Sequence, residues 1–149
     1  MNLYSTNRET AIFEFYEWYE AAEAYLNAAI RSSDAPSNPK IPLGFLQLSV
    51  EYACKAVIMS IGGNLPTHNP YVLSTRCRRL VPGLHKAARL YAPDIQRLFF
   101  FLDPAYYQQR DPAPRLPVVS EWKKLVRAVR QFLRVLEILF RARLERLLG

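Results

Sequence analysis

Cysteine, histidine and glycine are all scarce in this chain of 149 residues, with two, two and five copies. Two cysteines cannot make a disulfide framework, and with two histidines they form no spacing typical of a metal site. The glycines form no phosphate-binding loop, no Gly-x-Ser-x-Gly turn and no Asn-Gly or Asp-Gly hairpin. These absences argue against disulfide-rich, zinc-dependent and serine-hydrolase classes, and we expect neither a metal nor a cofactor.

The N-terminal residues lack a basic stretch followed by an apolar run, so the sequence shows no signal peptide. Residues 43–61 are apolar over a length that could span a bilayer. However, Gln47, Glu51 and Lys55 lie in the middle of that run, where charges are costly in lipid. We expect a buried core helix here, in a cytoplasmic protein without membrane contact.

Half of the residues are hydrophobic, which suits one domain covering residues 1–149. No convincing alternating strand pattern occurs, and the prolines fall at segment ends. The predicted fold class is all-α, an up-and-down helical bundle of four long helices plus one or two short helices. The expected long helices are 7–31, 43–61, one from 70 to about 80–83 and one from 120 nearly to 149, with one or two short ones near 84–91 and 93–107, a loop at 34–42 and irregular backbone at 112–117.

Helix-end signals support these boundaries. Gly62 and Gly63 form a normal helix stop, Pro70 suits a first helical position, and Ser120 is placed to cap the last helix. The last helix has an apolar seam with bundle spacing. The seam consists of Trp122, Leu125, Val129, Phe132, Leu136 and Leu139.

The expected first helix holds more aromatic side chains than one inward stripe needs. They are Phe13, Phe15, Tyr16, Trp18 and Tyr19. Two interpretations stay open: a core flanked by ordinary exposed tyrosines, or an oligomer interface rich in aromatics.

The formal charge of +7 is unevenly distributed. Residues 1–32 carry a net charge of −3, whereas residues 33–119 and 120–149 carry +5 each. This separation favours an anionic partner, either a nucleic acid, a nucleotide or the acidic face of a sister subunit. The candidate nucleic-acid surface consists of Arg76, Arg78, Lys123, Arg127, Arg130 and Arg134. A solvated helix face is the alternative for the last four.

A set of short motifs runs through the chain in order. Glu51 is followed one turn later by Lys55 in an apolar helix, then come Gly62-Gly63, the Leu-Pro-Thr-His segment 65–68, and a Tyr-x-x-Arg segment ending at Arg110 beside a proline. In this order the sequence resembles the HEPN (higher eukaryote and prokaryote nucleotide-binding) domains, which are helical bundles. The resemblance extends over nearly the whole chain.

The resemblance implies a ligand site around a polar cleft. Its expected residues are Glu51, Lys55, His68, Tyr107 and Arg110. In this interpretation Lys55 and Arg110 bind phosphate, Glu51 orients Lys55, and His68 closes the cleft. The alternative for Glu51 and Lys55 is a structural ion pair, which stabilises a helix by roughly 0.2–0.5 kcal/mol.

Ribonuclease members of this family carry an arginine followed by four to six residues and a histidine. Arg79 and His85 satisfy that count, with arginine suited to stabilising phosphorane charge and histidine to acid–base work. Pro82 and Gly83 interrupt the spacer, and Leu80 replaces the usual polar residue after the arginine. The balance favours a protein without catalysis; a metal-independent endoribonuclease remains the alternative.

The sequence therefore predicts a non-catalytic HEPN-type binding module for a nucleotide, an RNA or a nucleotidyltransferase partner, with a homodimer or such a partner expected. The first alternative is a dimeric ribonuclease of the toxin–antitoxin or defence type that uses Arg79 and His85. The second is a structural subunit of a larger complex, held through the aromatic first helix.

Overall fold

The computed structural model describes residues 8–33, 40–63, 65–66, 70–81, 83–84 and 119–148. Within these ranges the backbone is almost entirely helical and contains no strand, which confirms the predicted all-α class. The elements in chain order are α1 (Arg8–Ser33), α2 (Lys40–Val57), the π-helical turn η1 (Ile58–Gly62), α3 (Pro70–Leu80) and α7 (Val119–Leu148).

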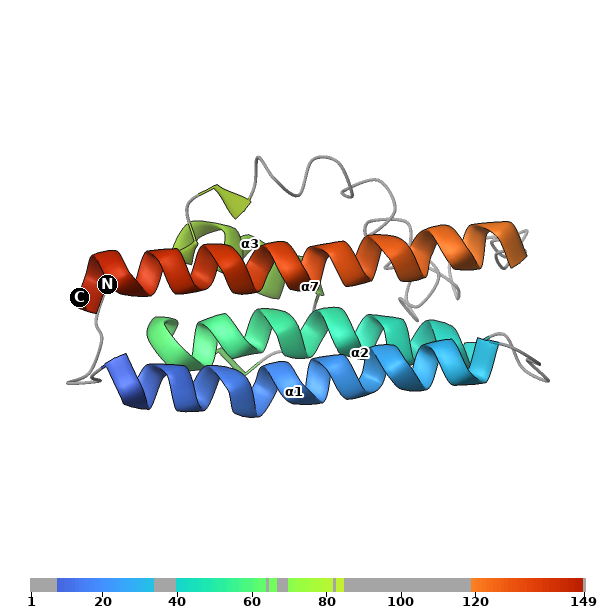
Figure 1. Ribbon diagram of the computed structural model, residues 1–149, viewed down its shortest axis with the longest axis horizontal. Coiled ribbons are helices and arrows are strands. Elements are labelled where there is room, and N and C mark those ends of the chain that lie inside the picture. Colours follow the sequence, from blue (N-terminus) through green and yellow to red (C-terminus); the bar gives the residue numbers. More distant parts are fainter. Residues whose placement is uncertain are drawn as a thin grey trace.

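The three longest helices, α1, α2 and α7, run alongside one another with nearly aligned axes (Figure 1). Helix α2 runs antiparallel to α1, and α7 also runs antiparallel to α1, so the start of α1 and the end of α7 meet at one end of the bundle. There Arg8 forms an ion pair with Glu145. Helix α3 packs mainly against α2 and η1.

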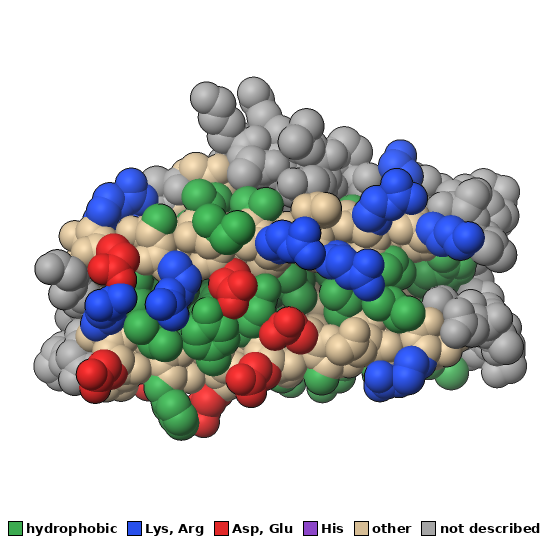
Figure 2. Space-filling model, in the orientation of Figure 1, with side chains coloured by type: hydrophobic (Ala, Val, Ile, Leu, Met, Phe, Trp, Pro, Cys, Tyr) green, Lys and Arg blue, Asp and Glu red, His purple; other side chains and the backbone are tan. Residues whose placement is uncertain are grey.

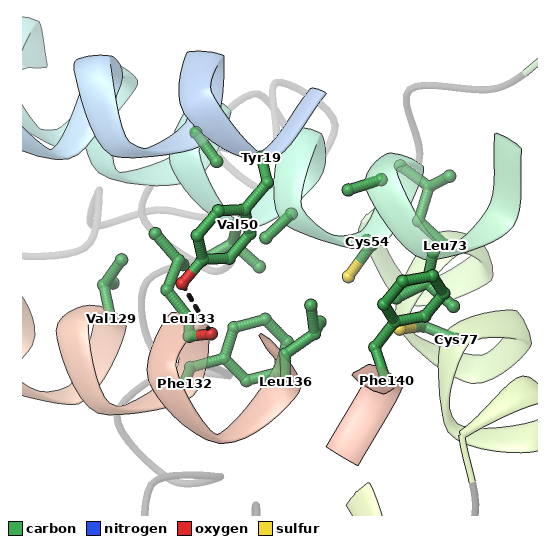
Figure 3. Close-up of a cluster of buried hydrophobic side chains, with 14 of the residues drawn as sticks. Tyr19, Val50, Cys54, Leu73, Cys77, Val129, Phe132, Leu133, Leu136 and Phe140 are labelled. Atoms are coloured by element: carbon green, nitrogen blue, oxygen red, sulfur yellow. Dashed lines mark hydrogen bonds between the residues drawn. The ribbon is translucent and has the colours of Figure 1, made fainter. Parts of the chain in front are cut away.

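One hydrophobic core joins all of these elements. Helix α2 lies at its centre, as its apolar composition predicted. Its inward side chains include Leu43, Leu46, Val50, Cys54 and Val57, all nearly inaccessible to solvent. Figure 3 shows Val50 and Cys54 meeting side chains from α3 and α7.

Buried hydroxyl groups tie neighbouring helices together. The Ser49 hydroxyl on α2 donates a hydrogen bond of 2.7 Å to the Ala22 carbonyl on α1. The Tyr19 hydroxyl on α1 donates one of 2.9 Å to the Leu133 carbonyl on α7 (Figure 3). Each bond satisfies a polar group that burial would otherwise destabilise.

The start of α2 differs from the prediction. The loop was expected to continue to residue 42, but the helix begins at Lys40 and includes Pro42. Proline is compatible with a helix's first turn, because the amide groups there have no intrahelical acceptor. The predicted stop is confirmed, since Gly63 has a φ of 82° and ends η1. Only glycine adopts that region without strain.

The stretch Ile41–Ile61 is long and apolar enough to cross a membrane, by length and composition alone. Buried core helices pass the same test, and 61% of this stretch is buried inside the protein. Glu51 is itself buried within it. The position of the stretch at the centre of the bundle accounts for its composition.

The structure shows which aromatic side chains of α1 face the core. Phe15 and Tyr19 are buried, whereas Phe13 is 65% exposed. Tyr16 and Trp18 are partly buried against the core.

The predicted seam of α7 is confirmed, with Leu139 alone only partly buried. Phe140 and Leu144 extend the buried seam toward the end of the helix. The helix begins at Val119, so Ser120 lies inside its first turn instead of capping it. Helix ends commonly shift by such a margin. The short helices expected near 84–91 and 93–107 lie, apart from residue 84, outside the described residues, as does the irregular stretch 112–117.

Candidate functional site

Glu51 and Lys55 lie one turn apart on α2 and face each other. The Lys55 ammonium nitrogen is 3.5 Å from Glu51 Oε2, and the two side chains are only 13% and 7% exposed. Burial of two opposite charges costs solvation that their attraction must offset. The predicted Glu–Lys pair is therefore present and largely enclosed.

Two aromatic rings flank the Lys55 ammonium group. The Lys55 nitrogen lies 5.9 Å from the centroid of Trp18 on α1 and 5.7 Å from that of Tyr52 on α2. The two rings are themselves 5.5 Å apart, with planes inclined by 30°. Both distances to the cation are within the range of cation–π attraction. A lysine in this position holds its charge beside π faces as well as beside a carboxylate.

The aromatic contacts continue along the edge between α1 and α2. Tyr25 on α1 lies 5.1 Å from Tyr52 and 6.2 Å from Phe45, measured between ring centroids. A hydrogen bond with Tyr52 is the main cause that raises the pKa of Tyr25, and the Glu51 charge adds to it. We call these four side chains the aromatic row. It consists of Phe45, Tyr25, Tyr52 and Trp18.

The sequence interpretation missed the aromatic row. Trp18 and Tyr25 are seven residues apart and so lie on one flank of α1, a signal available from spacing alone. That this flank faces Tyr52 and Lys55 depends on how α1 packs against α2, which spacing does not give.

The arrangement suits recognition of a phosphorylated aromatic ligand. An ammonium group binds phosphate through three donors and a full positive charge. Aromatic side chains offer surfaces on which nucleobases stack, with roughly 1–3 kcal/mol per base. Lys55 and the aromatic row place both kinds of group at one edge of the bundle.

His68, Tyr107, Arg110 and His85 lie outside the described residues. Arg79 is exposed near the end of α3.

The helix that carries Arg79 ends one residue later. Helix α3 ends at Leu80, and Val81 and Leu84 are buried in a turn closed by a 3.2 Å bond from the Leu84 amide to the Val81 carbonyl. Gly83 has a φ of 92° in this turn. The spacer toward residue 85 therefore does not continue α3, as its proline and glycine suggested.

The predicted basic stripe of α7 is exposed. It consists of Lys123, Arg127, Arg130 and Arg134. Figure 2 shows basic side chains gathered over this part of α7. Arg76 and Arg79 on α3 line a separate pocket of about 290 Å³ with Val72 and Thr75.

Arg130 and Arg134 line a groove of about 270 Å³ between α1 and α7. Glu23 and Glu137 line the same groove, one from each helix. Partial burial, followed by repulsion from Glu137 and Glu20, raises the pKa of the Glu23 carboxyl. Charges of both signs therefore share this groove. In the part of the chain that the structure describes, no cluster of three or more acidic, cysteine or histidine residues could hold a metal ion.

Comparison with known proteins supports the family resemblance. A model of the HEPN domain family matches residues 15–139, which is most of the chain. The matched range contains the Glu51–Lys55 pair, the aromatic row and the basic stripe of α7. Comparison with curated proteins and with solved structures gave no match.

Proposed function

Since this chain belongs to the HEPN domain family, we propose that it is a non-catalytic binding module that recognises the phosphate and base of a nucleotide. The nucleotide is either free or part of an RNA. Lys55 binds the phosphate, Glu51 orients Lys55, and the aromatic row supplies a stacking surface.

The observation that carries this proposal is the enclosed Lys55 beside Trp18 and Tyr52. A purely structural Glu–Lys pair needs no aromatic neighbours, and on an exposed helix face it contributes little. Here a partly buried cation and stackable rings lie at one edge. That combination is the chemistry a nucleotide requires.

Two features argue against the ribonuclease alternative. Helix α3 ends at Leu80, the residue after Arg79, and a positive-φ glycine lies in the spacer. The neighbour expected to be polar is the apolar Leu80, which packs against the core. Arg79 instead lines a small surface pocket with Val72 and Thr75.

The proposal is tested by titrating the full chain with inorganic phosphate, mononucleotides and a short single-stranded RNA, with thermal unfolding and calorimetry as readouts. A ligand that binds only the folded state stabilises it by about 2.7 kcal/mol at a concentration 100-fold above its Kd. We expect nucleotide or RNA to stabilise the protein more than phosphate does. The comparison of mononucleotide with RNA tells which of the two is the ligand.

Lys55→Gln should weaken binding by about tenfold or more, because a charge-assisted contact is lost. Arg146→Gln is the control, since Arg146 is exposed on α7 and belongs neither to the aromatic row nor to the candidate nucleic-acid surface. In a Trp122→Phe background, quenching of Trp18 fluorescence reports base stacking, which inorganic phosphate cannot cause. Equal binding by Lys55→Gln and the unmodified chain would contradict the site. RNA cleavage that Arg79→Ala abolishes would contradict the non-catalytic assignment.

A further inference from the structure

The groove between α1 and α7 has an apolar floor and polar walls. Its volume is about 270 Å³. The floor consists of Tyr19, Leu26 and Leu133, each at most 6% exposed. The Tyr19 hydroxyl donates its hydrogen bond to the Leu133 carbonyl, so the floor offers a ligand little polar contact. Recognition in this groove therefore depends on the side chains of its two walls.

The polar groups of the walls follow an order along the groove. Because α7 runs antiparallel to α1 (Figure 1), residues that follow Glu23 on α1 lie beside residues that precede Glu137 on α7. Glu23 and Glu137 thus mark one end, Asn27 and Arg130 mark the other, and Arg134 lies between them. Figure 2 shows acidic and basic side chains close together along this boundary between the two helices. The groove offers acceptors at one end and donors at the other.

The acceptor end suits an ammonium group. Partial burial raises the pKa of the Glu23 carboxyl, and repulsion from Glu137 across the groove is the next cause. Glu137 is positioned from its other side by Tyr16, whose phenol forms hydrogen bonds with Glu137 and with Arg141. An ammonium group between the two carboxylates would relieve their repulsion and donate a charge-assisted hydrogen bond to each.

The donor end suits a carboxylate. The guanidinium of Arg130 presents parallel donors that match the two oxygens of a carboxylate, and the Asn27 amide adds a further donor. Both side chains are exposed, so a ligand reaches them from solvent. The groove therefore places groups for a cation and for an anion on one apolar floor.

Helix geometry sets the distance between the two ends. Asn27 follows Glu23 by four residues, which is roughly 6 Å along the axis of α1, and Arg130 precedes Glu137 by seven, roughly 10 Å along α7. A free α-amino acid separates its nitrogen from its carboxyl carbon by only about 2.5 Å, so it cannot reach both ends. An extended peptide of two or three residues spans roughly 7–11 Å and can.

We propose that this groove binds a short linear zwitterion, with its ammonium group between Glu23 and Glu137 and its carboxylate against Arg130 and Asn27. A peptide of two or three residues and an ω-amino acid of similar length share this chemistry. The volume of about 270 Å³ suits a ligand of that size, because pockets for larger, drug-sized molecules have roughly 300–1,000 Å³.

The groove is separate from the proposed nucleotide site. Trp18 and Tyr25 lie on the flank of α1 that faces Tyr52 on α2, whereas the groove lies on the α7 side of α1. A nucleotide also fits the groove poorly, since Glu23 and Glu137 repel phosphate placed beside them. The two sites are therefore expected to bind independently.

The test is calorimetric titration of the full chain with triglycine and with ε-aminocaproate. We expect saturable binding, and the stronger of the two ligands tells whether peptide amide groups contribute. Glycine is too short to reach both ends, and acetylated triglycine lacks the ammonium group. Each of these should bind more weakly by about tenfold or more, because one charge-assisted contact is lost.

Substitutions at the two ends locate the ligand. Glu23→Gln and Arg130→Gln should each weaken binding of the preferred zwitterion by about tenfold. Glu17→Gln and Arg127→Gln are the matched controls, since both residues are exposed on the same helices and neither lines the groove. Circular dichroism verifies that all four variants keep the helical fold.

Three results would overturn the proposal. They are no saturable binding of either zwitterion, equal affinity for glycine, and unchanged affinity in Glu23→Gln or Arg130→Gln. Lys55→Gln should retain zwitterion binding, and its loss there would place the ligand at the aromatic row instead.

Discussion

Phe15 of α1 and Phe140 of α7 stack face to face, with ring centroids 4.1 Å apart and planes inclined by 8°. Both rings are fully buried. They join the first and last helices of the described chain, which are also linked, among other contacts, by the Tyr19 hydrogen bond and by the Arg8–Glu145 ion pair. That ion pair is exposed and contributes little to stability. The stacked pair instead brings two large buried side chains into contact between α1 and α7.

Phe140→Ala should lower the free energy of unfolding by about 3–5 kcal/mol, because it removes a buried ring and leaves a cavity beside Phe15. Chemical denaturation monitored by circular dichroism measures the change. Ile41→Ala is the control, since Ile41 is 49% exposed, and its effect should stay within about 0.5 kcal/mol. A similar loss of unfolding free energy in both variants would show that the stacked rings stabilise the fold no more than an exposed side chain does.

Ser49→Ala should destabilise the protein by about 1 kcal/mol, because the hydroxyl that bridges α2 to the Ala22 carbonyl is lost. Ser60→Ala should cost less, since the Ser60 hydroxyl bonds only to carbonyls of its own helical segment, at Ala56 and Val57. Both hydroxyls are buried, so the comparison isolates the bond between helices. Denaturant midpoints of the two variants measure this difference. Equal losses of unfolding free energy would contradict a special role for the hydrogen bond between helices.

The stability of the protein should fall at alkaline pH through Tyr19. Burial, aided by the charges of Glu137 and Glu23, raises the pKa of the Tyr19 phenol well above its ordinary value of 10.0. The folded chain thus holds the phenol proton more tightly than the unfolded chain. The stability that protonated Tyr19 contributes is therefore complete below pH 10.0 and is lost as pH rises above that value.

Tyr19→Phe removes the titrating group, so the decline in unfolding free energy above pH 10.0 should be shallower than in the parent. At neutral pH the same variant should lose about 1 kcal/mol, because the bond to the Leu133 carbonyl is gone. Urea unfolding at a series of pH values gives both quantities. Parallel pH curves for the two proteins would be the contrary result.

The thiols of Cys54 and Cys77 should react slowly with a disulfide reagent in the folded protein and fully after unfolding. Both are free and buried. A hydrogen bond with Cys54 and burial raise the pKa of the Cys77 thiol, so its reactive thiolate is suppressed. Time courses of thiol modification with and without denaturant provide the measurement. Rapid modification of the two thiols in the native chain would contradict their burial.

The sequence predicted where the helices lie better than which of their faces are buried. The apolar run at 43–61, the glycine stop and the seam of α7 follow from local periodicity, and the structure confirms them. Phe13 and Phe15 could not be distinguished in this way, because α1 carries aromatics on more than one side and burial depends on where α2 and α7 pack. The helical start at Lys40 was missed because Pro42 indicated a loop, although proline fits a first turn equally well.

The candidate site was predictable only in part. The Glu51–Lys55 pair lies within one helix, so the four-residue spacing in the sequence was enough to predict the contact. The contact between Trp18 and Lys55 joins residues far apart in the chain, and only the packing of α1 on α2 brings them together. The charges of both signs in the groove between α1 and α7 likewise come from two helices whose separate charge patterns were visible in the sequence.

The π-helical turn at the end of α2 fixes the length of the central helix. A π turn accommodates one residue more than an α turn, and here Ile58 and Ile61, both within it, are buried. Deleting a single residue between 58 and 62 would therefore let an ordinary α-helix form while the preceding turns keep their orientation toward the core. A one-codon deletion in the α-helical part of α2 should harm the fold more, because it rotates the positions on one side of the deletion by about 100° around the axis.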